Sequence, residues 1–395
     1  MESELKTLAP TPSGSLSEST MPIDDDRPLL KSDPNTPQIQ SQVCNPNIEE
    51  MEKKYAAYVR HDVYGTMGRG ELPWPEKLLL ALGLILLVPI RAVASMSILV
   101  IYYIICRLCT VLKAPNREDE QEDYAHMGGW RRAVIVQTGK FLSRGLLFVF
   151  GFYWIRKTIR SNDAEGKVNN ENESMDQSED MERPGAIVSN HVSYLDILYH
   201  MSSSFPSFVA KRSVAKLPLV GLISKCLGCI YVQRESKSSN FKGVSGVVND
   251  RIREAHQNKF APKMMLFPEG TTTNGDYILP FKTGAFLAKA PVLPVILRYP
   301  YQRFSPAWDS ISGARHVLLL LCQFVNYMEV TQLPVYCPSQ QEKDDPKLYA
   351  ENVRRLMAHE GNLILTDIGL AEKRVYHAAL NGNNRMRTVL HQKDD

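Results

Sequence analysis

The sequence lacks most features of a secreted or nucleic-acid-binding protein. It has only seven cysteines in 395 residues, an odd number that does not suit a disulfide framework and fits exposure to the cytosol better. No apolar segment preceded by basic residues stands near the start, so we expect no secretory signal. The formal net charge is only +3, and no basic patch interleaved with aromatic residues occurs, so nucleic acid is not an expected partner.

Spacings typical of metal sites are also scarce. Two Cys-x-x-Cys pairs occur, at Cys106–Cys109 and Cys226–Cys229. A zinc site usually needs two such half-sites close together in the fold, and the first pair lies in an apolar run. We therefore expect plain buried thiols and no metal. No spacing typical of a calcium-binding EF-hand loop is present, which makes calcium control through such a loop unexpected.

The N-terminal part of the chain is polar. Residues 1–45 are rich in Ser, Pro, Thr, Glu and Asp, a composition that buries too little apolar surface to fold alone. We expect residues 1–60 to form a disordered tail. Within it, Asp25 stands four positions before Leu29–Leu30, a spacing that resembles an acidic dileucine sorting signal but also arises often by chance.

Residues 78–112 are the most apolar part of the chain. An uncharged run at 78–90 is followed by Arg91 and a second apolar run at 92–106. Each run is shorter than the ~20 residues that a membrane-crossing helix needs, and an arginine in mid-span is costly. Basic residues on both flanks predict that both ends face the cytosol. We therefore predict a membrane-embedded helical hairpin over residues 72–113, bent near Pro89. Two buried helices of a soluble protein are the alternative.

Two further segments separate this apolar region from the rest. Residues 145–155 are apolar and aromatic but too short to span, so we predict amphipathic or interfacial helices over 124–160. Residues 161–183 are acidic and rich in Asn and Ser, a composition typical of a flexible linker.

From residue 184 onward, short apolar strands alternate with helical stretches. Examples are "GAIVSN" before "SYLDILYHMSS" and "KMMLFPEG" before "FKTGAFLAKA". This alternation predicts an α/β domain with a largely parallel sheet over residues 184–340, followed by a C-terminal helix and tail at 341–395. In such folds the functional residues usually follow the carboxyl ends of the strands.

Residues 189–197 read "SNHVSYLDI" and place a histidine and an aspartate five positions apart after a predicted strand. In one helix, residues at this spacing differ in direction by about 140°, so the side chains meet only if the chain turns between them. A turn at His191 and a helix starting near Ser193 would bring Asp196 back to the imidazole. Ser193 and Asp196 also have the spacing of a helix capping box. The stretch alone favours the acid–base pair and the cap equally, and the two are compatible.

Two other predicted strands end in residues suited to an anionic ligand. In "LFPEGTTTNG", Glu269 and Gly270 directly follow a strand, and Thr271 and Thr272 offer hydroxyls and amides without charge. Glycine there would let a ligand approach the backbone closely. "GCIYVQRE" ends in Arg234, whose guanidinium suits a phosphate, although a surface ion pair is the alternative.

Four blocks, in order, resemble the membrane glycerolipid acyltransferases. They are "NHVSYLD", "GCIYVQR", "FPEGT" and the proline of "VLPVIL", and they lie within roughly 184–300. The stretches "RPGAIVSNHVSYLDILYH" and "FPEGTTTNGDYILPFKTGAF" look very like the plant lysophosphatidylethanolamine acyltransferases.

The resemblance implies an acyl-CoA-dependent lysophospholipid acyltransferase in the endoplasmic reticulum membrane, with its active site facing the cytosol. Acyl-CoA would be a co-substrate, and no bound cofactor is implied. His191 would act as general base, and Asp196 would hold and stabilise the imidazole. The resemblance assigns the region of the acceptor's phosphate to Arg234, Glu269, Gly270, Thr271 and Thr272. A carboxylate would repel a phosphate, so we expect Glu269 to orient Arg234 or a backbone amide.

One departure from the family concerns the head group. Members that act on lysophosphatidic acid commonly carry a basic residue just after "EGT", whereas here Thr272, Thr273 and Asn274 follow. A phosphomonoester gains most from an added cation, so the neutral run favours a zwitterionic acceptor such as lysophosphatidylethanolamine or lysophosphatidylcholine. Lys211 and Lys282 are the residues that could replace the missing charge. The alternatives are a lysophosphatidic acid acyltransferase and a non-catalytic membrane-binding protein, the latter disfavoured by the intact pair.

Overall fold

The computed structural model describes residues 48–118, 121–161, 183–232, 241–308 and 313–381. Three features predicted from the sequence lie wholly or mostly outside these ranges. They are the dileucine-like motif near Asp25, the linker at 161–183 and the candidate phosphate ligand Arg234.

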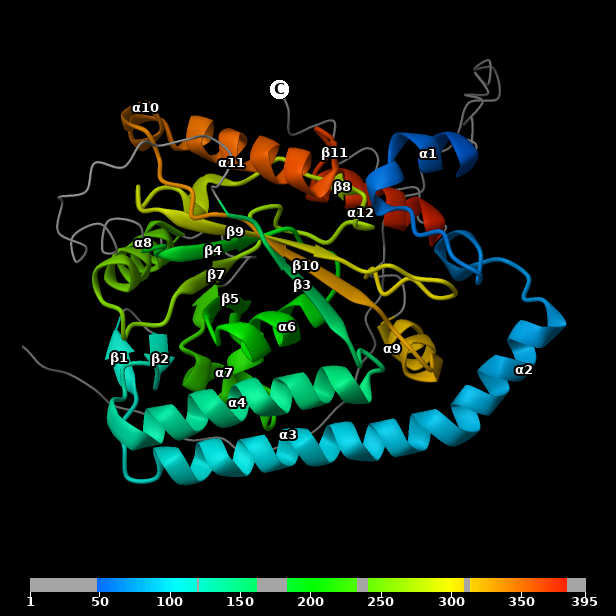
Figure 1. The fold of residues 1–395 in the computed structure, drawn as a ribbon, viewed down its shortest axis with the longest axis horizontal. Coiled ribbons are helices and arrows are strands. Elements are labelled where there is room, and N and C mark those ends of the chain that lie inside the picture. The colour runs from blue at the N-terminus through cyan, green and yellow to red at the C-terminus, as the bar shows by residue number, and fades with distance from the viewer. Residues whose placement is uncertain (1–47, 119–120, 162–182, 233–240, 309–312, 382–395) are drawn as a thin grey trace, which may run out of the picture. The chain divides into compact units, whose positions relative to one another are not determined.

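A seven-stranded sheet forms the centre of the fold (Figure 1). Its order is β3 (Ile155–Ile159), β10 (Met328–Gln332), β9 (Val292–Arg298), β4 (Ala186–Ser189), β7 (Met264–Leu266), β5 (Ser207–Lys211) and β6 (Ile230–Val232). The five strands from β9 to β6 run parallel, while β10 lies antiparallel to β9 and pairs in parallel with β3. The predicted α/β fold with a largely parallel sheet is therefore confirmed.

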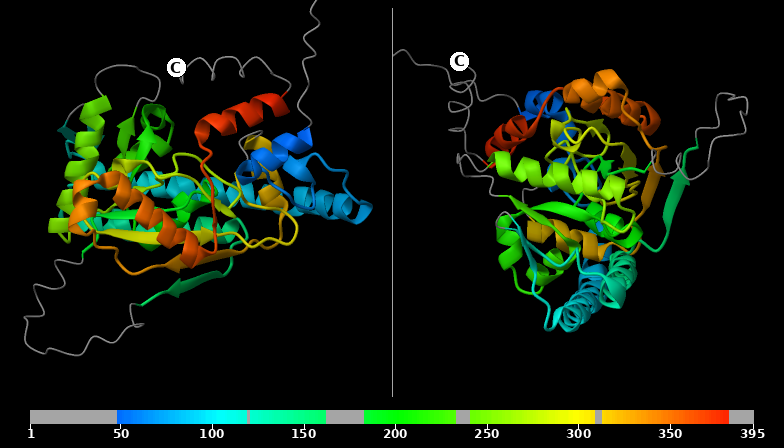
Figure 2. Two further views of the ribbon diagram at one scale, coloured as in Figure 1. Left: turned by 90° about the horizontal axis from the view of Figure 1, so that it is seen from above. Right: turned by 90° about the vertical axis from the view of Figure 1, so that its left-hand side faces the viewer.

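Helices cover both faces of the sheet, as Figure 2 shows from the end. On one face lie α6 (Leu195–Ser203) and α7 (Val220–Leu227), and on the other α8 (Phe241–Gln257) and α11 (Pro346–Gly361). The central strand β4 is buried along its whole length. Its residues alternate between the two layers, with Ile187 in one core and Ala186 and Val188 in the other, as the two-residue period of a strand requires.

The apolar region near the N-terminus forms one long helix and does not reverse. α2 (Trp74–Leu82), a π-helical turn (Gly83–Leu87) and α3 (Val88–Thr110) together make a helix of 37 residues that is long and apolar enough to cross a membrane. The predicted bend back at Pro89 is therefore wrong. Pro89 is the second residue of α3 and follows the π-turn, a place where a missing backbone N–H costs little.

Arg91 is buried and caps a helix of the domain. Its guanidinium donates to the carbonyls of Leu321, at 2.9 Å, and Gln323, at 2.5 Å, at the end of α9 (Gly313–Cys322). The last carbonyls of a helix have no partner within that helix, so a cation there supplies both hydrogen bonds and charge. The arginine that the sequence placed in mid-span thus faces the domain.

The helix that packs along α3 is α4 (Gly129–Val149), and the two lie side by side in Figures 1 and 2. The outward side of this pair, of α2 and of the π-turn carries many exposed large apolar side chains, including Trp74, Ile85, Val93, Leu108, Trp130 and Phe141. We call this surface the apolar helix face.

The predicted disordered tail at 1–60 overlaps folded structure, because a helix begins at Ile48. α1 (Ile48–Lys54) and a 3₁₀ turn (Ala56–Tyr58) bury Met51, Tyr55 and Tyr58. These positions follow helical spacing and pack with Tyr376 of α12 (Leu370–Leu380) in one apolar cluster. The apolar spacing in 51–58 outweighs the polar composition of the residues before it.

The remaining short elements complete the fold. They are the hairpin of β1 (Asn116–Glu118) and β2 (Gln121–Asp123), β8 (Tyr277–Ile278) paired with β11 (Ile364–Leu365), α10 (Gln340–Asp344), and 3₁₀ turns at Thr66–Gly68, Arg212–Lys216 and Thr283–Ala285. Both predicted Cys-x-x-Cys pairs are buried free thiols, and among the described residues no group of three or more possible ligands could hold a metal ion.

Candidate active site

The chain leaves the sheet immediately after Asn190. The side-chain oxygen of Asn190 accepts from the amide of Leu297 at 2.8 Å, and its amide group donates to the Leu297 carbonyl at 2.9 Å. The side chain therefore continues the pairing of β4 with β9 while the backbone turns away. This anchors the start of the turn that carries His191.

His191 and Asp196 form a hydrogen-bonded pair. His191 Nδ1 lies 2.8 Å from Asp196 Oδ2, which also accepts the amides of Val192 at 2.8 Å and Ser193 at 3.0 Å. The Asp196 carboxylate is fully buried, and α6 begins one residue before it. The predicted contact between His191 and Asp196 is present, and the carboxylate also accepts the Ser193 amide, but the capping box is not formed, because α6 has Tyr194 as its N-cap and no side-chain cap. The Ser193 hydroxyl takes no part in a cap.

The orientation of the imidazole leaves its second nitrogen for a substrate. A carboxylate on Nδ1 fixes the proton there, so Nε2 keeps its lone pair. The ring stacks on Phe267, with centroids 4.1 Å apart and planes at 18°, and the His191 side chain keeps one fifth of its surface exposed. A hydroxyl group that reached Nε2 could give up its proton there.

Glu269 is buried and supports the turn. Its two oxygens accept the backbone amides of His191, at 2.8 Å, and of Leu279, at 2.9 Å. Burial raises the pKa of Glu269 from 4.5 to about 8, against the opposing effect of these two amide hydrogen bonds. The expectation that Glu269 orients a backbone amide is met, whereas its assignment as a substrate contact does not fit a fully engaged, buried side chain.

Gly270 adopts a backbone conformation that other residues rarely take, with φ of +72°. A side chain here would also meet Lys282, whose Nζ lies 2.5 Å from the position of a Cβ. The Lys282 amide donates to the carbonyl of Pro268 at 2.9 Å, which holds the lysine over the turn. One of the two lysines considered from the sequence therefore lies at the glycine turn.

Thr272 faces the protein interior, contrary to its assignment as a substrate contact. Its hydroxyl donates to the carbonyl of Trp308 at 3.0 Å. The ammonium of Lys373, from α12, donates to the Thr272 hydroxyl at 2.7 Å and carbonyl at 2.8 Å, and both residues are buried. The neutral residues after Gly270 predicted a turn without positive charge, but Lys373, 101 residues further along the chain, supplies an ammonium group to it. Thr271, by contrast, is half-buried at the turn.

Three residues that support the pair were missed from the sequence. Tyr299 donates its hydroxyl to Asp196 Oδ1, Phe267 stacks on the imidazole, and Asn190 anchors the turn. Phe267 and Asn190 flank the two motifs, so their positions offered a signal. Tyr299 follows β9 and shares no local pattern with Asp196, 103 residues earlier.

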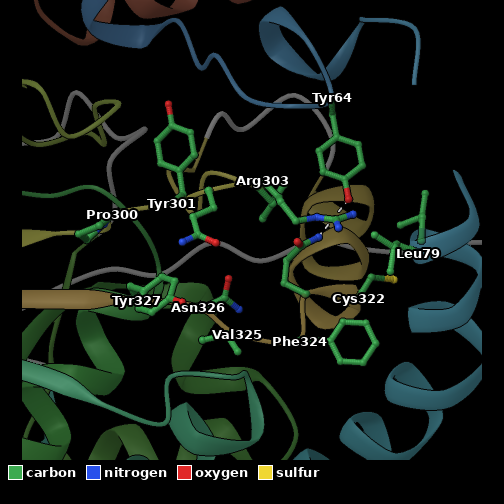
Figure 3. Close-up of a pocket in the computed structure, with 14 residues that line it drawn as sticks. Tyr64, Leu79, Pro300, Tyr301, Arg303, Cys322, Phe324, Val325, Asn326 and Tyr327 are labelled. Carbon is green, nitrogen blue, oxygen red and sulfur yellow. Dashed lines mark hydrogen bonds between the residues drawn. The ribbon is translucent and has the colours of Figure 1, made fainter. Parts of the chain in front are cut away.

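A separate pocket of about 210 Å³ lies beyond the carboxyl end of β9 (Figure 3). Its lining comes from the segment before α2, from α2, and from the segments after β9 and α9, and includes Tyr64, Leu79, Arg303, Gln323 and Tyr327. The Gln323 amide donates to the Tyr64 hydroxyl at 3.1 Å across it. Neither member of the His–Asp pair lines this pocket.

Comparison with known proteins gives several matches. The Acyltransferase family matches residues 167–298. The lysophospholipid acyltransferase LPEAT1 of Arabidopsis thaliana is 62% identical over 413 aligned positions that cover 100% of both chains. LPEAT2 of the same plant is 31% identical over 77% of this chain and 51% of its own. The lysophosphatidylcholine acyltransferase of Drosophila melanogaster is 34% identical over 69% and 47%.

The chain therefore spans about half the length of the last two relatives and all of the first. Among solved structures, the 1-acyl-sn-glycerophosphate acyltransferase PlsC of Thermotoga maritima aligns with 69% of this chain and 95% of its own, with a TM-score of 0.42 and 13% identity.

Proposed function

The chain belongs to the lysophospholipid acyltransferase family, and from this premise we propose that it transfers a fatty acyl chain from acyl-CoA to the free hydroxyl of lysophosphatidylethanolamine. The observation that carries the proposal is the hydrogen-bonded pair itself, in which a buried carboxylate holds Nδ1 of the partly exposed His191 imidazole and leaves Nε2 as its basic nitrogen. A non-catalytic scaffold has no need of a buried, hydrogen-bonded carboxylate behind a partly exposed imidazole.

The proposed reaction uses His191 as general base. The acceptor hydroxyl gives its proton to Nε2 while its oxygen attacks the thioester carbonyl of acyl-CoA, and Asp196 stabilises the imidazolium that forms. The tetrahedral intermediate then collapses, the carbon–sulfur bond breaks, and the imidazolium returns the proton to the departing thiolate of CoA. The transfer is direct, with no acyl-enzyme, and needs no resident cofactor.

The turn at Gly270 is the proposed place for the acceptor's phosphate. The positive φ of Gly270 and the ammonium of Lys282 beside it supply a close backbone approach and a positive charge. Lys211 ends β5, a strand that runs parallel to β4, so it reaches the same edge of the sheet. Arg234 lies outside the described residues, two positions after the end of β6 in the sequence, and remains a proposed phosphate ligand.

The proposed preference for an ethanolamine head group rests on the sequence resemblance. The neutral run at Thr272 does not leave the turn without positive charge, because Lys373 and Lys282 both lie close to it. The charge argument against lysophosphatidic acid is therefore removed, and the choice rests on the sequence resemblance to the plant enzymes. Values of kcat/KM for lysophosphatidylethanolamine, lysophosphatidylcholine and lysophosphatidic acid, measured with one labelled acyl-CoA, decide it.

We further propose that the enzyme lies at the endoplasmic reticulum membrane with its active site towards the cytosol. The apolar helix face supports this, because side chains such as Ile85, Val93 and Leu108 keep about two thirds of their surface exposed to solvent. Both substrates are amphiphiles, so an enzyme held at the membrane surface meets them where they collect.

The test of the function is His191→Ala in the full chain, assayed in microsomes with labelled acyl-CoA and the three lysolipids. Loss of the general base should lower acyl transfer by at least about 100-fold, with expression and membrane association unchanged. The matched control is His359→Ala, because the His359 side chain is 85% exposed on α11 and should leave activity intact. Near-normal turnover in His191→Ala would rule out the general-base role. Absence of any transfer by the unaltered chain would support the non-catalytic alternative.

A further inference from the structure

The Asp196 carboxylate has a second, separate hydrogen-bond donor on its other oxygen. Oδ2 is shared by His191 and two backbone amides, while Oδ1 accepts from the hydroxyl of Tyr299 at 2.5 Å. Tyr299 lies directly after β9, the strand next to β4, and has only 8% of its surface exposed. The two oxygens of one carboxylate thus face two different parts of the fold.

The Tyr299 hydroxyl can act here only as a donor. Burial, and after it the Asp196 charge, raises the pKa of Tyr299 well above its ordinary value, so the hydroxyl stays protonated. A carboxylate inside the protein is costly unless its lone pairs are satisfied. Tyr299 supplies the single side-chain donor to Oδ1 among the contacts that the described residues make with Asp196.

The Tyr299 ring packs against the turn that follows α4. It packs edge-on against Phe152, with centroids 5.9 Å apart and planes at 76°. Phe152 is completely buried in the turn after α4, and its carbonyl accepts from Arg144 at 3.0 Å. The position of the hydroxyl is therefore set by the strand that carries Tyr299 and by the end of α4.

We propose that Tyr299 is a positioning residue for acyl transfer. Its hydroxyl keeps the Asp196 carboxylate aligned with the His191 imidazole, and its hydrogen bond to Oδ1 reduces the negative charge that Oδ2 presents to the ring. The proposal rests on the proposed function of the His191–Asp196 pair. Without the hydroxyl, the carboxylate is held through Oδ2 alone, so its plane is less well fixed and more of its negative charge acts on the imidazole. The first effect lowers the rate, and the second stabilises the imidazolium.

The other titratable groups near Asp196 act in different pH ranges. Burial lowers the pKa of His200, one helical turn further along α6, to about 4, and it raises that of Glu269 to about 8. His200 is thus neutral throughout the range used for assays.

The experiment is Tyr299→Phe in the full chain, assayed for kcat, KM and the pH dependence of kcat/KM. Loss of one hydrogen bond to a charged group should lower kcat by about 10- to 100-fold, with KM within about twofold. The acid limb should move to higher pH. The matched control is Tyr199→Phe, since Tyr199 is a buried tyrosine on the same helix as Asp196 but does not donate to it.

A double-mutant cycle separates positioning from a general loss of packing. In an Asp196→Asn background the charged acceptor is absent, so Tyr299→Phe should change kcat by less than about twofold. Wild-type kcat and pH profile in Tyr299→Phe, or a full and additive loss in the double variant, would overturn the inference. Because His191→Ala tests the base alone, its inactivity beside an unaffected Tyr299→Phe would reject only the role of Tyr299.

Discussion

At the scale of single residues, the two buried carboxylates of the site, Asp196 and Glu269, have different hydrogen-bond partners. Asp196 meets four donors and serves the imidazole, whereas Glu269 meets two backbone amides and serves the turn. Both are hidden from solvent, and a sequence pattern cannot tell them apart. Their roles differ because the His191 ring contacts Asp196, whereas the His191 backbone amide donates to Glu269.

The raised pKa of Glu269 has a consequence for stability. Its carboxyl ionises at about 8 in the folded chain and near its ordinary 4.5 in the unfolded one. Between these values the folded state binds the extra proton, so the contribution of Glu269 to stability falls as pH rises through this window. The slope is at most about 1.4 kcal/mol per pH unit.

We therefore predict that the stability advantage of the unaltered chain over Glu269→Gln declines from pH 5.5 to pH 8. Glutamine keeps the shape but cannot ionise, and its amide group can accept only one of the two backbone N–H bonds. The measurement is thermal unfolding of the detergent-solubilised chain at several pH values, with the exposed Glu50→Gln as control. An advantage that stays constant or grows with pH would contradict the raised pKa.

At the scale of elements, the loop after Gly270 is held from two ends of the chain. Asn274 donates to the carbonyls of Ala56 and Val59, each at 3.0 Å. Lys373 of α12 donates to the carbonyl and the hydroxyl of Thr272. The Acyltransferase match ends at residue 298, well before α12. The C-terminal helix therefore supports the site although it lies outside the matched region.

Lys373→Met should destabilise this loop and slow acyl transfer. The substitution keeps the length of the side chain but removes the donors to two buried oxygens, at a cost of about 1–3 kcal/mol. We expect a lower melting temperature and equal losses of kcat/KM for all three lysolipids. The control is Lys347→Met, an exposed lysine on α11. A selective loss for lysophosphatidic acid would instead give the Lys373 charge a direct role in binding phosphate.

The sequence was informative where the interacting residues are neighbours in the chain. His191, Asp196, Glu269 and Gly270 lie within two short motifs, and the strand pattern placed both motifs at one edge of the sheet. It failed where a partner is remote. Tyr299, Lys373 and the carbonyls that Arg91 caps are each about 100 residues or more from the groups they contact, so no local pattern revealed them.

At the scale of the whole described chain, the segments on both sides of the long apolar helix pack against the same domain. Before it, Tyr55 and Tyr58 lie in one cluster with Tyr376, and after it the amide of Tyr124 donates to the carbonyl of Lys225 at 3.0 Å. A helix that crossed a bilayer once would separate these segments. We therefore predict that the 37-residue helix lies along one side of a bilayer and does not cross it.

We predict that tags at the N- and C-termini are both accessible to protease added outside sealed microsomes. The N-terminal side of α2 packs with α12, so the two ends of the domain share one compartment. The measurement is loss of each tag with and without detergent, with a lumenal marker as control. Protection of the N-terminal tag alone would mean that the helix crosses the bilayer and that the packing of residues 51–58 is absent in the membrane.

The turn between His191 and Asp196 depends on the number of residues that separate the two. The carboxylate closes a small ring through the amides of Val192 and Ser193, and these amides belong to any amino acid except proline. Exchange of the side chains between the pair leaves the ring intact. One inserted or deleted residue breaks it, because the carboxylate then no longer reaches the amides and the imidazole together. We therefore expect an inserted or deleted residue between His191 and Asp196 to abolish the pair, whereas substitutions there act through the packing of buried side chains such as Val192 and Leu195.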